Sequence, residues 1–202
     1  MKKSKAETAK TRERIVQVAA QEFRRNGIQQ TGVAEIMAAA GLTQGGFYRH
    51  FASKDQLVAE ACAASMSDRA HAADTAAQSG EDAFLKHLED FLSCKNRDDW
   101  SEGCSLVFLG SELARADKDT RHAATQGYRE IVDVIAKQSR IEDPAAAKAE
   151  ALFTLSAMIG AVTLSRIADD PELSAQILDV TKKALANVRA GAVPTTCEAG
   201  PK

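Results

Sequence analysis

The residues best suited to chemistry in this 202-residue chain lie in one short stretch, from Gln44 to Arg49. Gln44 carries an amide that can form paired hydrogen bonds with adenine, and Arg49 carries a guanidinium. Gly45 and Gly46 permit close backbone approach because they have no side chain, and Tyr48 adds a phenol. These residue types, side by side, are typical of a segment that contacts bases and phosphates in the major groove of DNA.

Two short helices must position this polar segment. Apolar residues recur at three- and four-residue intervals from Val33 to Ala40 and predict the first helix, which Gly41 ends by adopting a left-handed conformation. Thr43 is a good N-cap for a second helix, which begins with the polar segment. Phe47 and Phe51 lie four residues apart and are expected to face inward, which leaves the polar side chains exposed.

From Gly41 onward the sequence resembles the helix-turn-helix signature of the TetR family of bacterial transcriptional regulators. The matching segments, in order and spacing, are Gly41-Leu42, Phe47-Tyr48-Arg49-His50-Phe51 and Ser53-Lys54-Asp55-Gln56-Leu57. Gly32 departs from the family, which more often has Ser or Thr there, but glycine is a tolerable cap. The resemblance, together with their donor chemistry, places Thr31 and Lys54 where they would hold phosphates. The predicted DNA-binding residues are Thr31, Thr43, Gln44, Gly45, Gly46, Tyr48, Arg49, His50 and Lys54.

Composition predicts an all-α fold, because alanine is abundant and strand formers are sparse. Charge is unevenly placed. Residues 1–54 hold ten Lys and Arg against four Asp and Glu, a net charge of about +6, whereas residues 55–202 hold sixteen against twenty-four, about −8. Only the first part suits a polyanion. We predict an N-terminal arm with a three-helix DNA-binding domain (1–60), a helical bundle for ligand binding and dimerisation (61–190) and a disordered tail (191–202).

Other classes of function find no support in the sequence. Charged residues, and not an apolar signal, follow the N-terminal MKKSKAETAK, and the longest apolar run, Ala157–Leu164, is far shorter than the roughly 20 residues of a membrane span. We therefore expect a cytoplasmic protein without a membrane partner. The cysteines form no C-x-x-C pair and have no histidine at ligand spacing, so neither a structural zinc site nor a disulfide framework is indicated. No metal and no cofactor is expected. The sequence contains no phosphate-binding loop and no nucleophile motif, so we do not expect an enzyme.

Caps, stops and apolar spacing predict the remaining helices. After a polar arm at residues 1–10, the expected helical ranges are about 11–26, 54–78, 81–97, 104–116, 118–139, 144–168 and 171–190. The helix at 54–78 crosses the predicted domain boundary. It is therefore the expected mechanical route from an effector to the DNA-binding segment.

The last two helices carry small residues beside aliphatic ones, which allows close helix approach. Such faces fit either internal core or the seam of a symmetric dimer, and the family resembled dimerises through its last two helices. One short recognition helix also contacts too few base pairs for a unique site, so two copies on a palindromic operator are expected. The predicted dimer-interface residues are Leu152, Leu155, Ile159, Ile177, Leu178 and Leu185.

Aromatic and soft side chains in the second domain fit either plain core or the wall of an apolar pocket for a small-molecule effector. The predicted pocket residues are Phe84, Phe91, Trp100, Cys104, Phe108, Tyr128, Phe153 and Met158. Cys104 is expected in the first turn of its helix, where the dipole favours a thiolate that could sense oxidants or electrophiles, although a free cysteine is commonly a small buried apolar residue.

The leading interpretation is a homodimeric, ligand-responsive repressor. Two alternatives remain open, a thiol switch acting through Cys104 and a helical module that docks to protein or carries a ligand without binding DNA.

Overall fold

The computed structural model describes residues 4–100 and 103–189 of the chain. Every regular element in these residues is a helix, which confirms the predicted all-α class. In chain order they are α1 (Lys5–Asn26), α2 (Val33–Ala39), η1 (Gln44–Arg49), α3 (Lys54–Gln78), α4 (Glu81–Phe91), α5 (Cys94–Asp98), α6 (Ser105–Leu113), α7 (Lys118–Lys137), α8 (Pro144–Ile167) and α9 (Pro171–Arg189). The predicted tail, residues 191–202, lies outside the described residues.

Helix α1 begins at Lys5 and not at Thr11, so the predicted polar arm is wrong for residues 5–10. Ser4 starts the helix through a reciprocal capping box. Its hydroxyl oxygen accepts from the Glu7 backbone nitrogen at 3.1 Å, and the Glu7 carboxylate accepts from the Ser4 nitrogen at 2.7 Å. The Ser-x-x-Glu pattern was the sequence signal for this earlier start.

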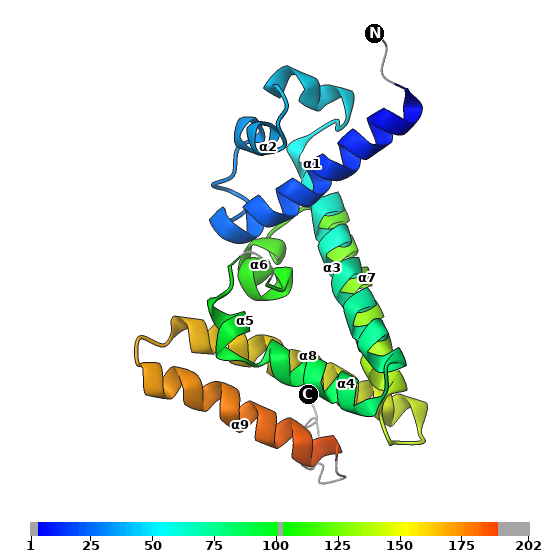
Figure 1. Cartoon of the computed structure of the whole chain (residues 1–202), viewed down its shortest axis with the longest axis vertical. Helices are drawn as coiled ribbons and strands as arrows, with labels where there is room; N and C mark the ends of the chain where they lie inside the picture. The colour runs from blue at the N-terminus through cyan, green and yellow to red at the C-terminus, as the bar shows by residue number, and fades with distance from the viewer. Residues whose placement is uncertain (1–3, 101–102, 190–202) are drawn as a thin grey trace, which may run out of the picture.

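Helices α1, α2 and η1 form a small head at one end of the molecule, with the start of α3 beneath it (Figure 1). Its core is built from fully buried apolar side chains that include Phe23, Ile36 and Phe47. Burying a side chain of this size contributes about 1.5–3 kcal/mol. Gly41 adopts a φ of 68° directly after α2, as its predicted role as helix stop requires.

The long helix α3 runs without a break from the head into the C-terminal helices, with the predicted bounds and with Ser53 as its cap. Its main partner is α7, which Asp117 caps and which lies along it (Figure 1). The two backbones approach closely at Gly127, where a side-chain Cβ would lie only 2.3 Å from the Cβ of Met66. The predicted domain boundary at residue 60 falls inside α3 and stays a prediction.

The helix predicted at residues 81–97 is two helices, α4 and α5, because the chain breaks at Leu92 and Ser93. The Ser93 hydroxyl donates to the Asp90 carbonyl at 2.7 Å and accepts from the Asn96 backbone nitrogen at 3.1 Å. It therefore ends one helix and caps the next. The turn redirects the chain towards α6, whose cap position is Cys104.

Helices α8 and α9 lie side by side at the far end from the head (Figure 1). Asp143 caps α8, and a proline opens each of the two helices, as predicted. By length and composition alone α8 could also cross a membrane, a test that core helices of soluble proteins pass as well. In this fold α8 packs against α6, α7 and α9.

Candidate nucleic-acid interface and effector cavity

The polar segment forms a 3₁₀ helix, η1, and not the predicted α-helix. The Thr43 side chain makes no capping hydrogen bond, so its predicted role as a side-chain cap is wrong. Because 3₁₀ hydrogen bonds are poorer than α-helical ones, η1 depends on tertiary packing. Phe47 supplies it: its buried ring lies 5.5 Å from the Phe51 ring and 5.2 Å from the Tyr48 ring, between centroids.

The outer face of η1 carries most of the predicted DNA-binding residues together. Thr43, Gln44, Gly45 and Arg49 are exposed, and Tyr48 has 76% of its surface exposed. A Cβ on Gly45 would meet no protein atom within 4 Å, so internal packing does not require glycine there. The same face therefore offers an amide, a phenol, a guanidinium and bare backbone to a partner outside the protein.

Three predicted contact residues are placed differently. Thr31 is fully buried and its hydroxyl donates to the Gly27 carbonyl at 2.6 Å, so the prediction that its side chain holds a phosphate is wrong. Lys54 is half-buried, and its ammonium donates to the Ile28 carbonyl at 2.6 Å. His50 is half-buried beside Phe51. Thr31 and Lys54 brace the loop between α1 and α2, and DNA contacts by Lys54 and His50 stay predictions.

Arg12 holds η1 in place, a role that sequence reasoning missed. Its guanidinium pairs with Glu60 of α3, with an Nη2–Oε1 distance of 2.6 Å, and its Nε donates to the His50 carbonyl at 3.3 Å. It also lies over the Phe51 ring, 4.5 Å from the centroid. Arg12 thus joins α1, the end of η1 and α3. Its partners lie 38 and 48 residues away in the chain, so no local pattern points to them.

Two polar links connect α6 to the head. The Glu112 carboxylate accepts from the Gln29 backbone nitrogen at 3.0 Å, at the loop between α1 and α2. The Ser105 hydroxyl lies 2.7 Å from the Ser65 hydroxyl, which in turn accepts from Arg24 at 3.2 Å. A shift of α6 would therefore act on the head directly as well as through α3.

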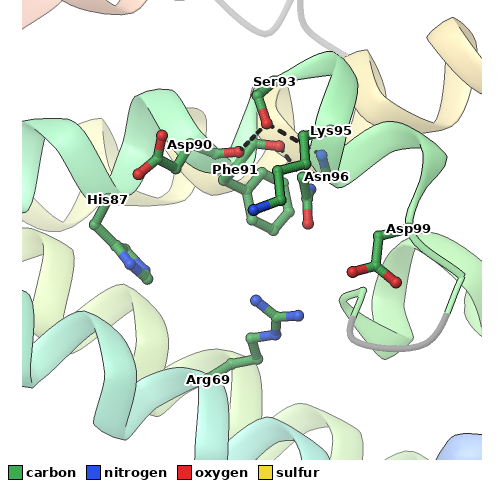
Figure 2. A pocket seen from close by; sticks show the side chains of 8 residues that line it. All are labelled: Arg69, His87, Asp90, Phe91, Ser93, Lys95, Asn96 and Asp99. Carbon is green, nitrogen blue, oxygen red and sulfur yellow. Dashed lines mark hydrogen bonds between the residues drawn. The ribbon is translucent and has the colours of Figure 1, made fainter.

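Two adjoining hollows share Arg69, His87 and Phe91 and are together called the cavity. The polar outer part lies between α3, α4 and the α5 region, and the apolar inner part lies between α3, α4, α7 and α8. Three predicted pocket residues, Phe91, Cys104 and Met158, line the inner part together. The inner part also meets Arg69 and His87, which continue into the outer part (Figure 2). Apart from Phe91, sequence reasoning missed the residues of the outer part, because charged side chains in the middle of helices are usually solvated.

The other predicted pocket residues do not line this cavity. Phe84 is fully buried core, and Tyr128 is half-buried against the core. Trp100 and Phe108 pack on each other and on Arg166, whose guanidinium lies 3.7 Å from the Phe108 ring centroid. Phe153 is 47% exposed on the outer face of α8, so its predicted pocket role is wrong.

The predicted dimer face is only partly exposed. Leu155, Leu178 and Leu185 are buried inside the chain's own core, so their interface role is wrong. Ile159 and Ile177 are half-buried, whereas Leu152 is 45% exposed. The exposed large apolar side chains of α8 and α9 are Leu152, Phe153, Leu164, Ile167, Leu173 and Val180.

Burial controls the chemistry of the two inner cysteines. It raises the pKa of the Cys62 thiol to about 11, with a further contribution from the neighbouring Cys104. Burial also raises the pKa of Cys104, and this outweighs the backbone N–H groups of Leu106 and Val107, which lower it. The predicted first-turn thiolate is therefore disfavoured, since Cys104 caps α6 with its side chain buried.

We expect iodoacetamide at pH 8 to alkylate Cys94, which is exposed, well before Cys62 and Cys104. A pKa of about 11 leaves Cys62 with about a hundredfold less thiolate at this pH than an ordinary thiol has, and burial raises the pKa of Cys104 as well. Peptide mapping by mass spectrometry over time measures each of these three cysteines separately, and Cys94→Ser removes the exposed one as a control. Alkylation of Cys104 at the rate of Cys94 would instead favour the thiol-switch alternative, which stays a prediction.

Comparison with known proteins places this geometry in a family. A family model of the bacterial regulatory proteins of the TetR family matches residues 15–61, the head and the first turns of α3. A second model, the C-terminal domain of LmrA/YxaF-like transcriptional regulators, matches residues 80–179. The two matches together cover most of the chain.

Whole-chain relatives agree with these matches. The transcriptional regulator LmrA of Bacillus subtilis is 29% identical over 187 residues, covering 86% of this chain and 97% of LmrA. The structure of a TetR regulator from Chloroflexus aurantiacus has a TM-score of 0.72 at 26% identity, covering 92% of this chain and 96% of that one. Reduced Escherichia coli NemR, with a TM-score of 0.75 at 20% identity over 88% and 96% of the two chains, shares the fold. The chain belongs to the TetR family and is a helix-turn-helix transcriptional regulator.

Proposed function

We propose that the protein is a homodimeric repressor that binds a palindromic operator and leaves it when a small-molecule effector binds among the C-terminal helices. The outer face of η1 carries this proposal, because its exposed Gln44, Tyr48 and Arg49 belong to the basic part of the chain. Regulators of this family bind DNA operators and typically act as dimers. NemR of Escherichia coli, 27% identical over 136 residues that cover 63% of this chain and 66% of NemR, is named a transcriptional repressor.

In the proposed complex each residue of this face has a separate role. Gln44 pairs with the N6 and N7 edge of adenine, and Arg49 reaches guanine or a phosphate. Tyr48 and Thr43 donate to phosphate oxygens, which positions the head without selecting a sequence. Gly45 lets the backbone approach the groove, since a side chain there would lie between protein and DNA.

We propose that two copies associate through the exposed apolar face of α8 and α9 defined above. Six large apolar side chains on two adjacent helices form more exposed apolar surface than scattered residues would, and such patches mark interaction sites. A two-fold axis through this face brings the same residues of the two copies together and holds the two heads at a fixed separation. The half-sites are then about 34–36 Å apart or a multiple of that distance.

Effector control follows in this proposal from the links between α6, α3 and the head. An effector that prefers the conformation with the wrong head separation lowers operator affinity, by a coupling of about 1–3 kcal/mol in typical cases. Glu112 is the short route, since it binds the backbone of the loop that precedes α2. We also place the protein in the cytoplasm, with its DNA-binding domain ending near residue 60.

Selection of binding sites from random DNA tests the proposal. Sequencing should recover a palindrome, and affinity for it should fall linearly in the logarithm of salt concentration. Sedimentation of the complex should give an even number of chains per operator. A protein-docking or ligand-carrying module would select no DNA sequence, and that outcome would overturn the proposal.

We expect Gln44→Ala to relax base preference more than it weakens binding. Loss of one paired base contact costs about 1–3 kcal/mol of discrimination, which corresponds to about tenfold or more. Fluorescence anisotropy on the selected operator and on a scrambled site gives the ratio. Gln126→Ala, an exposed glutamine on α7, is the matched control and should change neither affinity. Equal losses on both DNAs for Gln44→Ala would remove the base-reading role.

A further inference from the structure

The outer part of the cavity between α3, α4 and α5 is a space of about 330 Å³ with cationic side chains directed into it (Figure 2). Arg69 reaches in from α3, and Lys95 reaches in from α5 on the opposite side. His87 and Asn96 add polar groups to the lining. We propose that this cavity binds a small amphipathic organic anion, a carboxylate on an apolar chain, as the effector of the proposed regulator.

The burial of Arg69 and its missing ion pair in the part of the chain that the structure describes are the main evidence for this proposal. Arg69 is half-buried, and among the described residues its guanidinium makes no ion pair or hydrogen bond, although it points into the cavity. A guanidinium held in a partly desolvated space favours a carboxylate, which it can bind through two parallel hydrogen bonds. Lys95 likewise has no ion pair with a described carboxylate and brings a second positive charge to the same space.

Two acidic residues, Asp90 and Asp99, also line the outer part of the cavity. Asp90 accepts from Lys86 at 2.5 Å, and its carboxylate points away from Arg69 (Figure 2). Asp99 lies on the other side of the cavity and faces it (Figure 2). His87 adds no positive charge at neutral pH, because burial and then the nearby Arg69 lower its pKa. Because Arg69 lines both parts of the cavity and pairs with neither carboxylate, it sets the sign of the ligand in this proposal.

The inner part of the cavity indicates that the part of the ligand beyond its carboxylate is an apolar chain. Its wall is apolar, with Leu88, Phe91, Leu155 and Met158 around a volume of about 30 Å³. This is too small for a ring or chain as the side chains stand, but methionine is unbranched and adapts its shape to a ligand. An apolar chain entering between Phe91 and Met158 keeps its carboxylate at Arg69, which lines both parts of the cavity.

This inference rests on the proposed function for its regulatory meaning, because Arg69 belongs to the helix that leads to the head. It also lies beside the link formed by Ser65 and Arg24, since a third hollow is lined by all three residues. An anion bound to the Arg69 guanidinium acts on α3 and on that link together. Ligand binding is thereby coupled to the position of η1.

Isothermal titration calorimetry of the full chain with three probes of equal length tests the charge preference: octanoate, 1-octanol and octylammonium. Octanoate should bind about tenfold or more tightly than octanol, the scale of a hydrogen-bonded ion pair. Arg69→Gln should abolish that preference and leave octanol binding unchanged. The control Arg129→Gln, an exposed arginine on α7, should keep the preference. No octanoate binding, equal binding of the three probes, or a preference for octylammonium would overturn the proposal.

A second measurement separates this inference from the proposed function. Octanoate is added to the complex of the chain with its selected operator, and release is followed by anisotropy for the wild type and for Arg69→Gln. Both proposals are supported if octanoate releases the wild type from the operator but does not release Arg69→Gln. A chain that selects no operator but binds octanoate through Arg69 contradicts only the repressor, and an operator complex that octanoate leaves intact contradicts only the anionic effector.

Discussion

Replacing Gly127 by alanine is expected to lower the melting temperature of the protein by about 4–8 °C, which corresponds to about 2 kcal/mol for a chain of this size. The added Cβ would lie 2.3 Å from the Cβ and 2.8 Å from the Cγ of Met66. Both Cβ atoms are fixed by their helix backbones, so only a shift of α3 against α7 relieves the clash. Overpacking of this kind costs about 1–3 kcal/mol or more.

The opposing effect of this substitution is smaller. Alanine is about 1 kcal/mol better than glycine in a helix interior, so helix propensity alone would stabilise the variant. Gly110→Ala isolates that gain, because its Cβ on α6 would meet no atom within 4 Å. Thermal unfolding followed by circular dichroism should show a loss for Gly127→Ala and a neutral or small gain for Gly110→Ala. Equal melting temperatures would show that α3 and α7 are not packed as closely as described.

The long helices could be predicted almost to the residue, because each carries its own local start signal. Ser53, Asp117, Pro144 and Pro171 stand where α3, α7, α8 and α9 begin. The start of α1 was missed although Ser4 and Glu7 form a capping box. The break between α4 and α5 was missed because neither Gly nor Pro stands there, and the cap role of Ser93 was not recognised.

The polar face of η1 was predictable from the same kind of local signal. Phe47 and Phe51 face inward, as their spacing indicated, and this directs Gln44, Tyr48 and Arg49 outward. The 3₁₀ geometry was not predictable, since the segment is too short for its hydrogen-bond pattern to follow from composition.

Positions set by distant partners were not predictable. Thr31 carries the right donor for a phosphate, but its burial depends on how the head closes over it. Helix α8 is apolar around much of its circumference, so the sequence does not say that Leu155 faces inward and Phe153 outward. Arg69 is an ordinary charged residue until α4 and α5 enclose it.

The second large effect is expected for Phe47→Ala, which should abolish specific operator binding while the C-terminal helices stay folded. The ring is fully buried, and truncating such a residue costs about 3–5 kcal/mol. Helix η1 has six residues and no side-chain cap, and a helix so short does not form without packing. Affinity for the selected operator, measured by anisotropy, should fall at least about a hundredfold.

Tyr48→Ala removes a predicted DNA contact but leaves the packing of Phe47 beneath η1 in place. Tyr48 is 76% exposed, so its removal should leave the melting temperature within about 1–2 °C of the wild type and weaken binding on all sequences alike. Phe47→Ala should differ by lowering the melting temperature as well, with little loss of far-ultraviolet circular dichroism at 10 °C. If Phe47→Ala bound the operator as tightly as the wild type, the surface built on its ring would not be the one that contacts DNA.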